Sequence, residues 1–356
     1  MTMKIWLAAL VILACATVRA GDAPLTRTVG PQGEAPTPHT VLELTPAQIE
    51  QAKAKKLKGV LLLHETSDYT NGIQAGVKDA FARAGVNLLV VTDAEMDANK
   101  QRTDIETSLA LNPDILITLV IDPVTGAVAL RQAVDKGVKI ALVDNHPAGF
   151  VHGKDYAGIV SDDLYNMGKS VAEMMADKTG GKAKVAWIYH DADFYVTNQR
   201  DQAVRNVLKA EYPDMEIITE RGIANPDDGE VLGGAILTQF PQVNAIYVPW
   251  DTIAEGVVAA ARAAERKDVK IFTMDLGANN SLDMVKGGNV AGVVADLPYS
   301  IGESVANMGI LAALGVDTPP FVVVPAIKID KDNLVESWNK SLNRNPPREV
   351  MDLVGK

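Results

Sequence analysis

The stretch ILITLVIDPVTGAVALRQAVDKGVKIALVDN, residues 115–145, decides the fold class of this chain. It begins with the apolar run Ile115–Ile121, continues through a longer stretch with spaced apolar positions, and ends in a second apolar run, Ile140–Val143. This pattern is typical of a βαβ unit, in which a helix joins two parallel strands. Asp122 and Asp144 directly follow the two runs. The segment therefore predicts parallel strands with acidic side chains at their carboxyl ends.

The same alternation continues along most of the chain. The apolar runs are Val60–Leu63, Asn87–Val91, Ile115–Ile121, Ile140–Val143, Ala157–Val160, Val185–Tyr189, Glu216–Thr219, Ala245–Val248, Val269–Met274, Ala291–Ala295 and Phe321–Ile327. Between them, apolar residues recur at spacings of three and four, as at Ile73, Val77 and Ala80, which would cover one face of a sheet. About eleven strands exceed one comfortable doubly wound sheet. We expect an α/β protein with two similar lobes, each with a mainly parallel sheet flanked by helices.

Composition limits the functions that this chain can have. Its 356 residues, 47% hydrophobic and 22% charged, suit a soluble globular protein of two domains. Because 34 basic residues face 45 acidic ones, a nucleic-acid partner is not expected. The single cysteine, Cys15, excludes a disulfide framework. Small molecules or proteins are the expected partners.

Residues 1–20 have the pattern of a secretion signal. Lys4 precedes the apolar run Ile5–Ala14, and Val18-Arg19-Ala20 offers small or short side chains where a signal peptidase acts. The run is too short to span a bilayer stably. We expect export to the periplasm. The alternative is a lipoprotein, because Ile12-Leu13-Ala14-Cys15 is similar to a lipobox that would anchor the protein through its cysteine.

The residues after this signal have two different patterns. From Gly21 to about His39 the chain is rich in proline, glycine and threonine, which predicts an extended, unpacked linker. Thr45-Pro46-Ala47-Gln48 then combines an N-cap, a proline at the first helical position and a capping-box glutamine. A helix is therefore expected from Pro46 to about Leu57.

Signals for an enzyme are weak. The sequence has no Gly-x-Gly-x-x-Gly motif, no Walker loop and no Gly-x-Ser-x-Gly elbow, so it offers no phosphate cradle and no acyl-transfer nucleophile. The five histidines do not have metal-ligand spacing. We expect no cofactor, no metal and no catalytic residues. A secreted glycosidase or isomerase remains an alternative, because a glycosidase needs only two carboxylates.

Polar and aromatic residues gather where the predicted strands end. They include the segments Glu65–Thr70, Asp122-Pro123, Asp144–His146, Phe194-Tyr195, Asn198–Arg200, Pro249–Asp251, Asp275 and Asp296. Ligands of open parallel sheets bind beyond these ends. Carboxylates accept hydrogen bonds from vicinal hydroxyls, a guanidinium donates them, and aromatic rings cover C–H faces, so the set predicts a site for a polyhydroxylated ring. Asp251 is equally explained as a helix N-cap, and Tyr69 as a core residue.

In this order the motifs resemble the periplasmic solute-binding proteins of the ribose-binding type, which share the type I fold with effector domains of lactose-repressor-like regulators. The motifs are Ser67-Asp68-Tyr69-Thr70 ahead of Gly76, Ile121-Asp122-Pro123, Leu142-Val143-Asp144, Ser161-Asp162-Asp163, Asn198-Gln199-Arg200, Pro249-Trp250-Asp251, Met274-Asp275, and Asp296-Leu297-Pro298 followed by Ile301-Gly302. The resemblance covers roughly Lys58 to Lys328.

The resemblance implies two lobes joined by three crossovers, near Ser161, Ala295 and Val324, with a sugar clamped between them. The expected division is a signal peptide (1–20), a proline-rich linker (21–44), a leading helix (45–57), lobe 1 (58–161 plus 297–324), lobe 2 (162–296 plus 325–341) and a tail (342–356). The ligand-facing set that it implies is Ser67, Tyr69, Thr70, Asp122, Asp144, Asn145, Arg200, Trp250, Asp275 and Asp296.

Several members of this set depart from the family pattern. The family often has a second aromatic residue at Thr70, arginine at Asn145, asparagine at Asp122 and Trp250, and glutamine or asparagine at Asp296. Four aspartates of the set oppose one arginine, so an acidic ligand would be repelled in a closed cleft. A neutral sugar or polyol is therefore expected, with an amino sugar or another cationic solute as the alternative.

The family also implies the partners. We expect a monomer that delivers its solute to the permease of an ABC importer, driven by an ATPase on other chains. A sensory role, with a chemoreceptor or a histidine kinase as the partner, uses the same fold and stays open. A transcriptional regulator would need a basic helix-turn-helix ahead of the first lobe, and residues 1–57 have the pattern of a signal and a linker instead.

Overall fold

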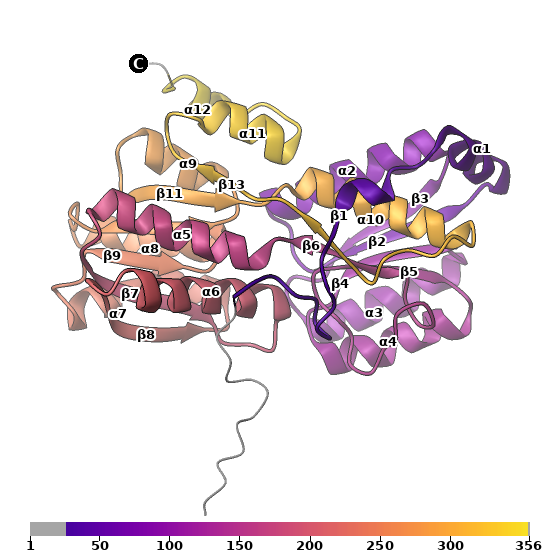
Figure 1. Cartoon of the computed structure of the whole chain (residues 1–356), viewed down its shortest axis with the longest axis horizontal. Coiled ribbons are helices and arrows are strands. Elements are labelled where there is room, and N and C mark those ends of the chain that lie inside the picture. The colour runs from indigo at the N-terminus through magenta and orange to yellow at the C-terminus, as the bar shows by residue number, and fades with distance from the viewer. Residues whose placement is uncertain (1–25, 355–356) are drawn as a thin grey trace, which may run out of the picture.

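The computed structural model describes residues 26–354 and contains two sheets, each flanked by helices in its own lobe (Figure 1). The first sheet has the order β1-β12-β6-β5-β4-β2-β3 and the second β13-β11-β10-β9-β7-β8. Every pair of neighbouring strands is parallel except β11 with β13. The predicted α/β fold with two mainly parallel sheets is confirmed.

The first lobe is built on the first sheet. Its strands are β1 (Thr37–Pro38), β2 (Lys58–Leu63), β3 (Asn87–Asp93), β4 (Ile115–Leu119), β5 (Lys139–Val143), β6 (Gly158–Asp162) and β12 (Phe321–Val324). Its helices are α1 (Pro46–Lys55), α2 (Asp68–Ala84), α3 (Ala98–Ser108), α4 (Pro123–Asp135) and α10 (Pro298–Ala313), with 3-10 turns at His39–Leu42 and Leu109–Leu111. The central strands are buried on both faces, which explains their continuous apolar runs.

The second lobe repeats this arrangement. Its strands are β7 (Ala183–His190), β8 (Met215–Ile223), β9 (Ala245–Val248), β10 (Lys270–Met274), β11 (Val290–Ala295) and β13 (Ile327–Ile329). Its helices are α5 (Leu164–Thr179), α6 (Tyr195–Glu211), α7 (Gly229–Gln239), α8 (Asp251–Ala263), α9 (Ala278–Val285) and α12 (Arg348–Met351), with a 3-10 turn at Pro226–Asp228. Helix α11 (Leu334–Leu342) contacts α10 and α2 of the first lobe and β13 of the second.

The last apolar run of the sequence forms two strands instead of one. Strand β12 pairs with β6 in the first sheet, and β13 pairs with β11 in the second. Pro325 lies between them and has no N–H to continue a ladder, so the chain leaves one sheet there and enters the other. The chain also passes between the sheets after β6 and after β11.

The proline-rich linker predicted over residues 21–44, unpacked from Gly21 to about His39, is packed in its described part, residues 26–44. Strand β1 pairs in parallel with β12, and Leu42 is buried in the core of the first lobe. At the second lobe, the Thr28 hydroxyl donates to Asp163 and accepts from the backbone N–H of Tyr165 at 2.9 Å, at the start of α5. Segment 26–44 therefore holds both lobes, a role that its proline content does not reveal.

Replacing Thr28 by valine is expected to lower the free energy of unfolding by about 1–2 kcal/mol, because Asp163 and the first turn of α5 lose their hydrogen-bond partner. Urea unfolding measures this change. Thr40→Val, at an exposed position of the same segment, is the matched control and should stay within about 0.5 kcal/mol of the wild type. Equal stability of the two variants would show that the segment is not held at α5.

The segments before and after residues 58–328 differ in how well the structure matches the prediction. Helix α1 begins at Pro46 behind the capping box of Thr45 and Gln48, and it ends at Lys55, two residues before the expected end. The segment expected to be a tail folds onto the second lobe instead, where α12 contacts α9 and Val350 is buried (Figure 1). Among the described residues, no helix has the length and apolar character needed to cross a membrane.

Candidate ligand-binding site

A cavity lies between the lobes. It is lined by His64, Glu65, Tyr69, Met96, Leu119 and Asp144 from the first lobe and by His190, Phe194, Val196, Thr197, Arg200, Trp250, Asp251 and Asp275 from the second. Most of these residues follow the carboxyl end of a strand or begin the next helix. The cavity is therefore at the position that the strand topology predicts.

Arg200 and Asp275 form a buried ion pair in the second lobe. Nη1 and Nη2 of Arg200, on α6, donate to the two carboxylate oxygens of Asp275 at 2.7 and 3.3 Å, and Nη2 also donates to the carbonyl of Pro249 at 3.2 Å. Burial alone would lower the pKa of Arg200, but the Asp275 carboxylate raises it above its ordinary value. The guanidinium therefore stays charged and is held by both partners.

Asp144 occupies the corresponding position in the first lobe. Like Asp275 it directly follows a strand and has a positive φ, 57° against 65°, in the left-handed region that aspartate tolerates. Its carboxylate accepts hydrogen bonds from the hydroxyls of Tyr69 and Ser161, both at 2.7 Å. Burial raises the pKa of Asp144 to about 6, although these two hydrogen bonds act in the opposite direction.

Five aromatic rings surround the cavity. The ring of His190 lies 4.9 Å from Trp250 and 5.1 Å from Phe194, and the ring of His64 lies 6.4 Å from Phe194 and 6.3 Å from Tyr69. Burial lowers the pKa of both histidines to about 4, so they are neutral at pH 7. The rings provide flat apolar walls that suit the C–H faces of a cyclic or extended polyol.

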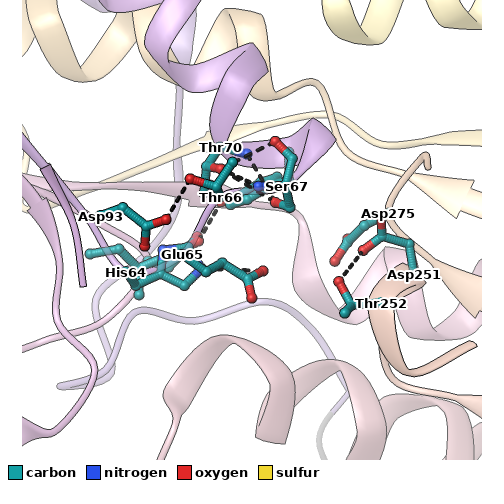
Figure 2. A network of polar contacts seen from close by, with 12 residues as sticks. His64, Glu65, Thr66, Ser67, Thr70, Asp93, Asp251, Thr252 and Asp275 are labelled. Carbon is teal, nitrogen blue, oxygen red and sulfur yellow. Dashed lines mark hydrogen bonds and ion pairs between the residues drawn. The ribbon is translucent and has the colours of Figure 1, made fainter. Parts of the chain in front are cut away.

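Glu65 and Asp251 add two carboxyls from opposite lobes. Figure 2 shows Glu65 extending from the first lobe toward Asp251 and Asp275 of the second, while Asp93 lies on the other side of His64. Burial raises the pKa of Glu65 to about 7, and the nearby carboxylates of Asp275 and Asp93 raise it further. Burial, followed by Asp275 and Glu65, raises the pKa of Asp251 well above its ordinary value.

Five of the ten predicted residues line the cavity, namely Tyr69, Asp144, Arg200, Trp250 and Asp275. Ser67 and Thr70 lie outside its lining and form the capping box of α2, in which the Thr70 N–H donates to the Ser67 hydroxyl. Asp122 accepts from the Thr125 N–H at 2.6 Å and caps α4, and these hydrogen bonds lower its pKa. Local helix capping therefore accounts for these three side chains.

The other two predicted residues are buried beside the cavity without lining it. The Asn145 amide donates to the Val120 carbonyl at 2.8 Å and accepts from the Val196 N–H at 3.2 Å, which ties the first lobe to α6 of the second. Asp296 is 1% exposed, and its two carboxylate oxygens have no hydrogen-bond partner within the described part of the chain. Burial and the carboxylate of Asp275 raise its pKa well above the ordinary value.

The predicted ligand-facing set leaves out six polar or aromatic residues of the lining: His64, Glu65, His190, Phe194, Thr197 and Asp251. Glu65 and Phe194 belong to polar segments that follow predicted strands, but which residue of each segment faces the cavity depends on the folded loop. The spacing of His64 and His190 in the sequence argues against metal binding, and it does not indicate that they face a ligand. Asp251 was assigned a possible N-cap role, but Trp250 is the N-cap residue of α8 and Asp251 is the first helical residue, with its carboxyl at the cavity.

The described residues contain no group of histidine, cysteine, aspartate or glutamate side chains that could hold a metal ion. Arg200 is the one arginine among the residues that line the cavity, and no lysine lines it within the described part. The chemistry that the lining offers is hydrogen bonding and apolar contact.

The buried carboxyls make stability depend on pH. Burial raises the pKa of Glu65 and Asp201 to about 7 and that of Asp144 to about 6, and three further buried carboxyls shift in the same direction. Folding therefore takes up protons, and the stability present at low pH is lost as the pH rises through these folded values. His64 and His190, whose pKa values are lowered, act oppositely below pH 6.5 but are fewer.

We expect the melting temperature of the ligand-free protein to be several degrees higher at about pH 6 than at about pH 8, as one pKa unit corresponds to about 1.4 kcal/mol. Differential scanning calorimetry in buffers of equal ionic strength measures this difference in melting temperature. A melting temperature that rises from pH 6 to pH 8 would mean that these carboxyls are solvated and ionised in the folded protein.

Comparison with known proteins agrees with this architecture. A family model described as periplasmic binding protein domain matches residues 58–315. A xylitol-binding protein of Mycolicibacterium smegmatis is 26% identical over 282 residues, which is 78% of this chain and 77% of that protein. A ribose import binding protein of Bacillus subtilis is 24% identical over 65% of this chain and 73% of its own length.

Solved structures show the same fold. An ABC transporter solute-binding protein from Agrobacterium vitis, bound with α-D-tagatopyranose, superposes with a TM-score of 0.73 at 18% identity, covering 82% of this chain and 99% of that one. A solute-binding protein from Bacillus halodurans with bound myo-inositol has a TM-score of 0.70 at 17% identity, covering 80% and 98%. Since the family model spans more than half of the sequence, this chain belongs to the periplasmic binding protein family, whose members are solute receptors and not enzymes.

Proposed function

We propose that this protein is an exported receptor that captures a neutral sugar or polyol between its two lobes and delivers it to an ABC importer. The observation that carries the proposal is the cavity between the lobes, where aromatic rings stand beside the Arg200–Asp275 pair and the hydrogen-bonded Asp144. Relatives named for xylitol and ribose, and solved neighbours bound with tagatopyranose and myo-inositol, support a polyhydroxylated solute.

The mechanism is a shift between open and closed forms. Asp144 and Tyr69 belong to the first lobe, whereas Arg200, Trp250 and Asp275 belong to the second, so a solute between them contacts both lobes only when they are closed. The solute stabilises the closed form by the contacts that the open form lacks. No bond of the solute is made or broken.

The partners and the location follow from the same proposal. The closed monomer presents its solute to a membrane permease whose ATPase is on other chains, and a chemoreceptor or histidine kinase is the alternative partner of the same closed form. Residues 1–20 direct export to the periplasm, or Cys15 anchors a lipoprotein, and both segments lie outside the described residues. A receptor of this kind needs no cofactor.

Thermal-shift screening of the purified protein against a library of sugars and polyols tests the proposal, because a ligand that binds the folded state raises its melting temperature. Native mass spectrometry of the protein as purified would detect a solute that it retains. We expect a rise of several degrees with at least one neutral sugar or polyol, and no product after long incubation. Turnover of the solute, or a shift with acidic sugars alone, would contradict the proposal.

A further inference from the structure

Two carboxyls of the cavity have no basic side chain beside them in the described part of the chain. The one basic group recorded beside Glu65 in the described residues is His64, whose Nε2 lies 3.9 Å from the carboxylate, and burial keeps that ring neutral at pH 7; the Ser67 side chain also contacts the carboxyl. Asp251 is 5% exposed, and the hydroxyl of Thr252, at 3.5 Å, is the one hydrogen-bond donor to its carboxyl group within residues 26–354. Both carboxyls therefore keep acceptor capacity that the protein does not use.

Arg200 cannot neutralise these carboxyls. Its Nη1 and Nη2 atoms are held by Asp275 and by the Pro249 carbonyl. Asp144 differs from Glu65 and Asp251, since two hydroxyls already donate to it. The unused acceptors of the cavity are therefore one carboxyl from each lobe.

The cavity also contains buried donors or acceptors that lack partners. Nε of Arg200 and Nδ1 of His64 have no hydrogen-bond partner among the described residues, and the two side chains are 4% and 6% exposed. Such atoms are costly in a folded protein unless another molecule completes them. These nitrogens are independent of the carboxyls and point to a polar ligand at the same place.

We propose that Glu65 and Asp251 determine the specificity of this site, by accepting hydrogen bonds from a donor-bearing group of the solute and by rejecting a carboxylate or phosphate there. This inference rests on the proposed function. The donor group is a pair of hydroxyls or an ammonium, which share N–H or O–H chemistry. Because no basic side chain lies beside these two carboxyls in the described part of the chain, an anion placed between them would lose its hydration without gaining a partner of opposite charge.

Calorimetric titration with matched sugars tests this. The probes are galactose, galactosamine and galacturonate, and the corresponding glucose series. We expect the wild type to bind the neutral or amino sugar at least 100-fold more tightly than the acid. In the double variant Glu65→Gln with Asp251→Asn, which keeps the side-chain volumes, this ratio should fall at least tenfold. Loss of the amino sugar alone identifies an ammonium, and equal loss of both identifies hydroxyls.

Asp93→Asn is the matched control, because Asp93 lies in the same polar network without lining the cavity, where it accepts from Thr66 at 2.5 Å and from the Glu95 N–H at 2.7 Å. Its ratio of affinities should stay within about threefold of the wild type. A folded double variant that binds the neutral sugar with the wild-type ratio would overturn the proposal and leave the proposed function standing.

If none of these sugars binds, the distance between the lobes of the solute-free protein still tests the role of Glu65 and Asp251. Spin labels at Val124 on α4 and Val231 on α7, which are 66% and 75% exposed, report the distance between lobes in a Cys15→Ser background. At pH 8, above the pKa of about 7 of Glu65, the double variant should show shorter distances than the wild type, because the negative charge of Glu65 that faces the second lobe is removed. Unchanged distances overturn the role of this carboxyl pair, whereas a wild type that binds no sugar or polyol refutes the proposed function.

Discussion

Arg200→Met is expected to lower the free energy of unfolding by about 3–5 kcal/mol and to abolish solute binding. The substitution removes the one cation that pairs with Asp275 among residues 26–354, and it leaves that carboxylate, which is 7% exposed, buried and uncompensated. Urea unfolding followed by circular dichroism gives the stability, and calorimetric titration gives the binding.

The double variant Arg200→Met with Asp275→Asn separates the effect of Arg200 on stability from its effect on solute binding. Without the charge at position 275 we expect most of the stability to return, while binding stays absent. Arg102→Met on α3, which breaks an exposed pair with Glu106 at 2.9 Å, is the matched control and should cost about 0.5 kcal/mol or less. An Arg200 variant as stable as this control would mean that the pair is solvated.

Gly76→Val is expected to lower the free energy of unfolding by about 3 kcal/mol or more. A Cβ at this position of α2 would lie 2.1 Å from the Tyr299 carbonyl oxygen on α10, which is shorter than van der Waals contact allows. A Cβ at Gly302 on α10 would likewise lie 2.2 Å from the Ile73 carbonyl oxygen. The two helices pack at this closeness only because both positions lack side chains. A backbone atom cannot rotate away, so the helices must separate.

Gly234→Ala provides the matched control for this prediction. Gly234 is also helical, on α7, but an added Cβ would meet no atom within 4 Å. Alanine there should stabilise the protein by about 0.4–1 kcal/mol, because the unfolded chain loses freedom and nothing is displaced. If Gly76→Val were no more destabilising than this control, the contact between α2 and α10 would not be tight in solution.

Much of the fold follows from the sequence because parallel strands buried on both faces need continuous apolar runs. Each predicted apolar run contains a strand. The run that ends at Ile327 differs from the prediction by forming two strands, because its apolar residues continue on both sides of Pro325 while the pairing partner changes from β6 to β11. Segment 26–44 was misread for a different reason. Its packing depends on partners such as Asp163, far along the chain, and local composition does not encode them.

The site was predictable where a residue's position on its strand fixes its direction. Asp144 and Asp275 follow strands directly and line the cavity, as expected. Asp122 also follows a strand run, but it caps α4, because an N-cap geometry satisfies the carboxylate locally. Glu65 lies two residues beyond its strand, and only the folded loop brings it to face Asp251.

If the solute binds between the lobes, removing an aromatic ring from either lobe should weaken its binding, and calorimetric titration of ring variants measures this. The solute with the largest thermal shift is titrated into the wild type, Tyr69→Ala and Phe194→Ala, which remove one ring from each lobe, and into Leu111→Ala at an exposed control position. We expect one solute per wild-type chain, at least tenfold weaker binding for each ring variant and no change for the control. Wild-type affinity in both ring variants would contradict it.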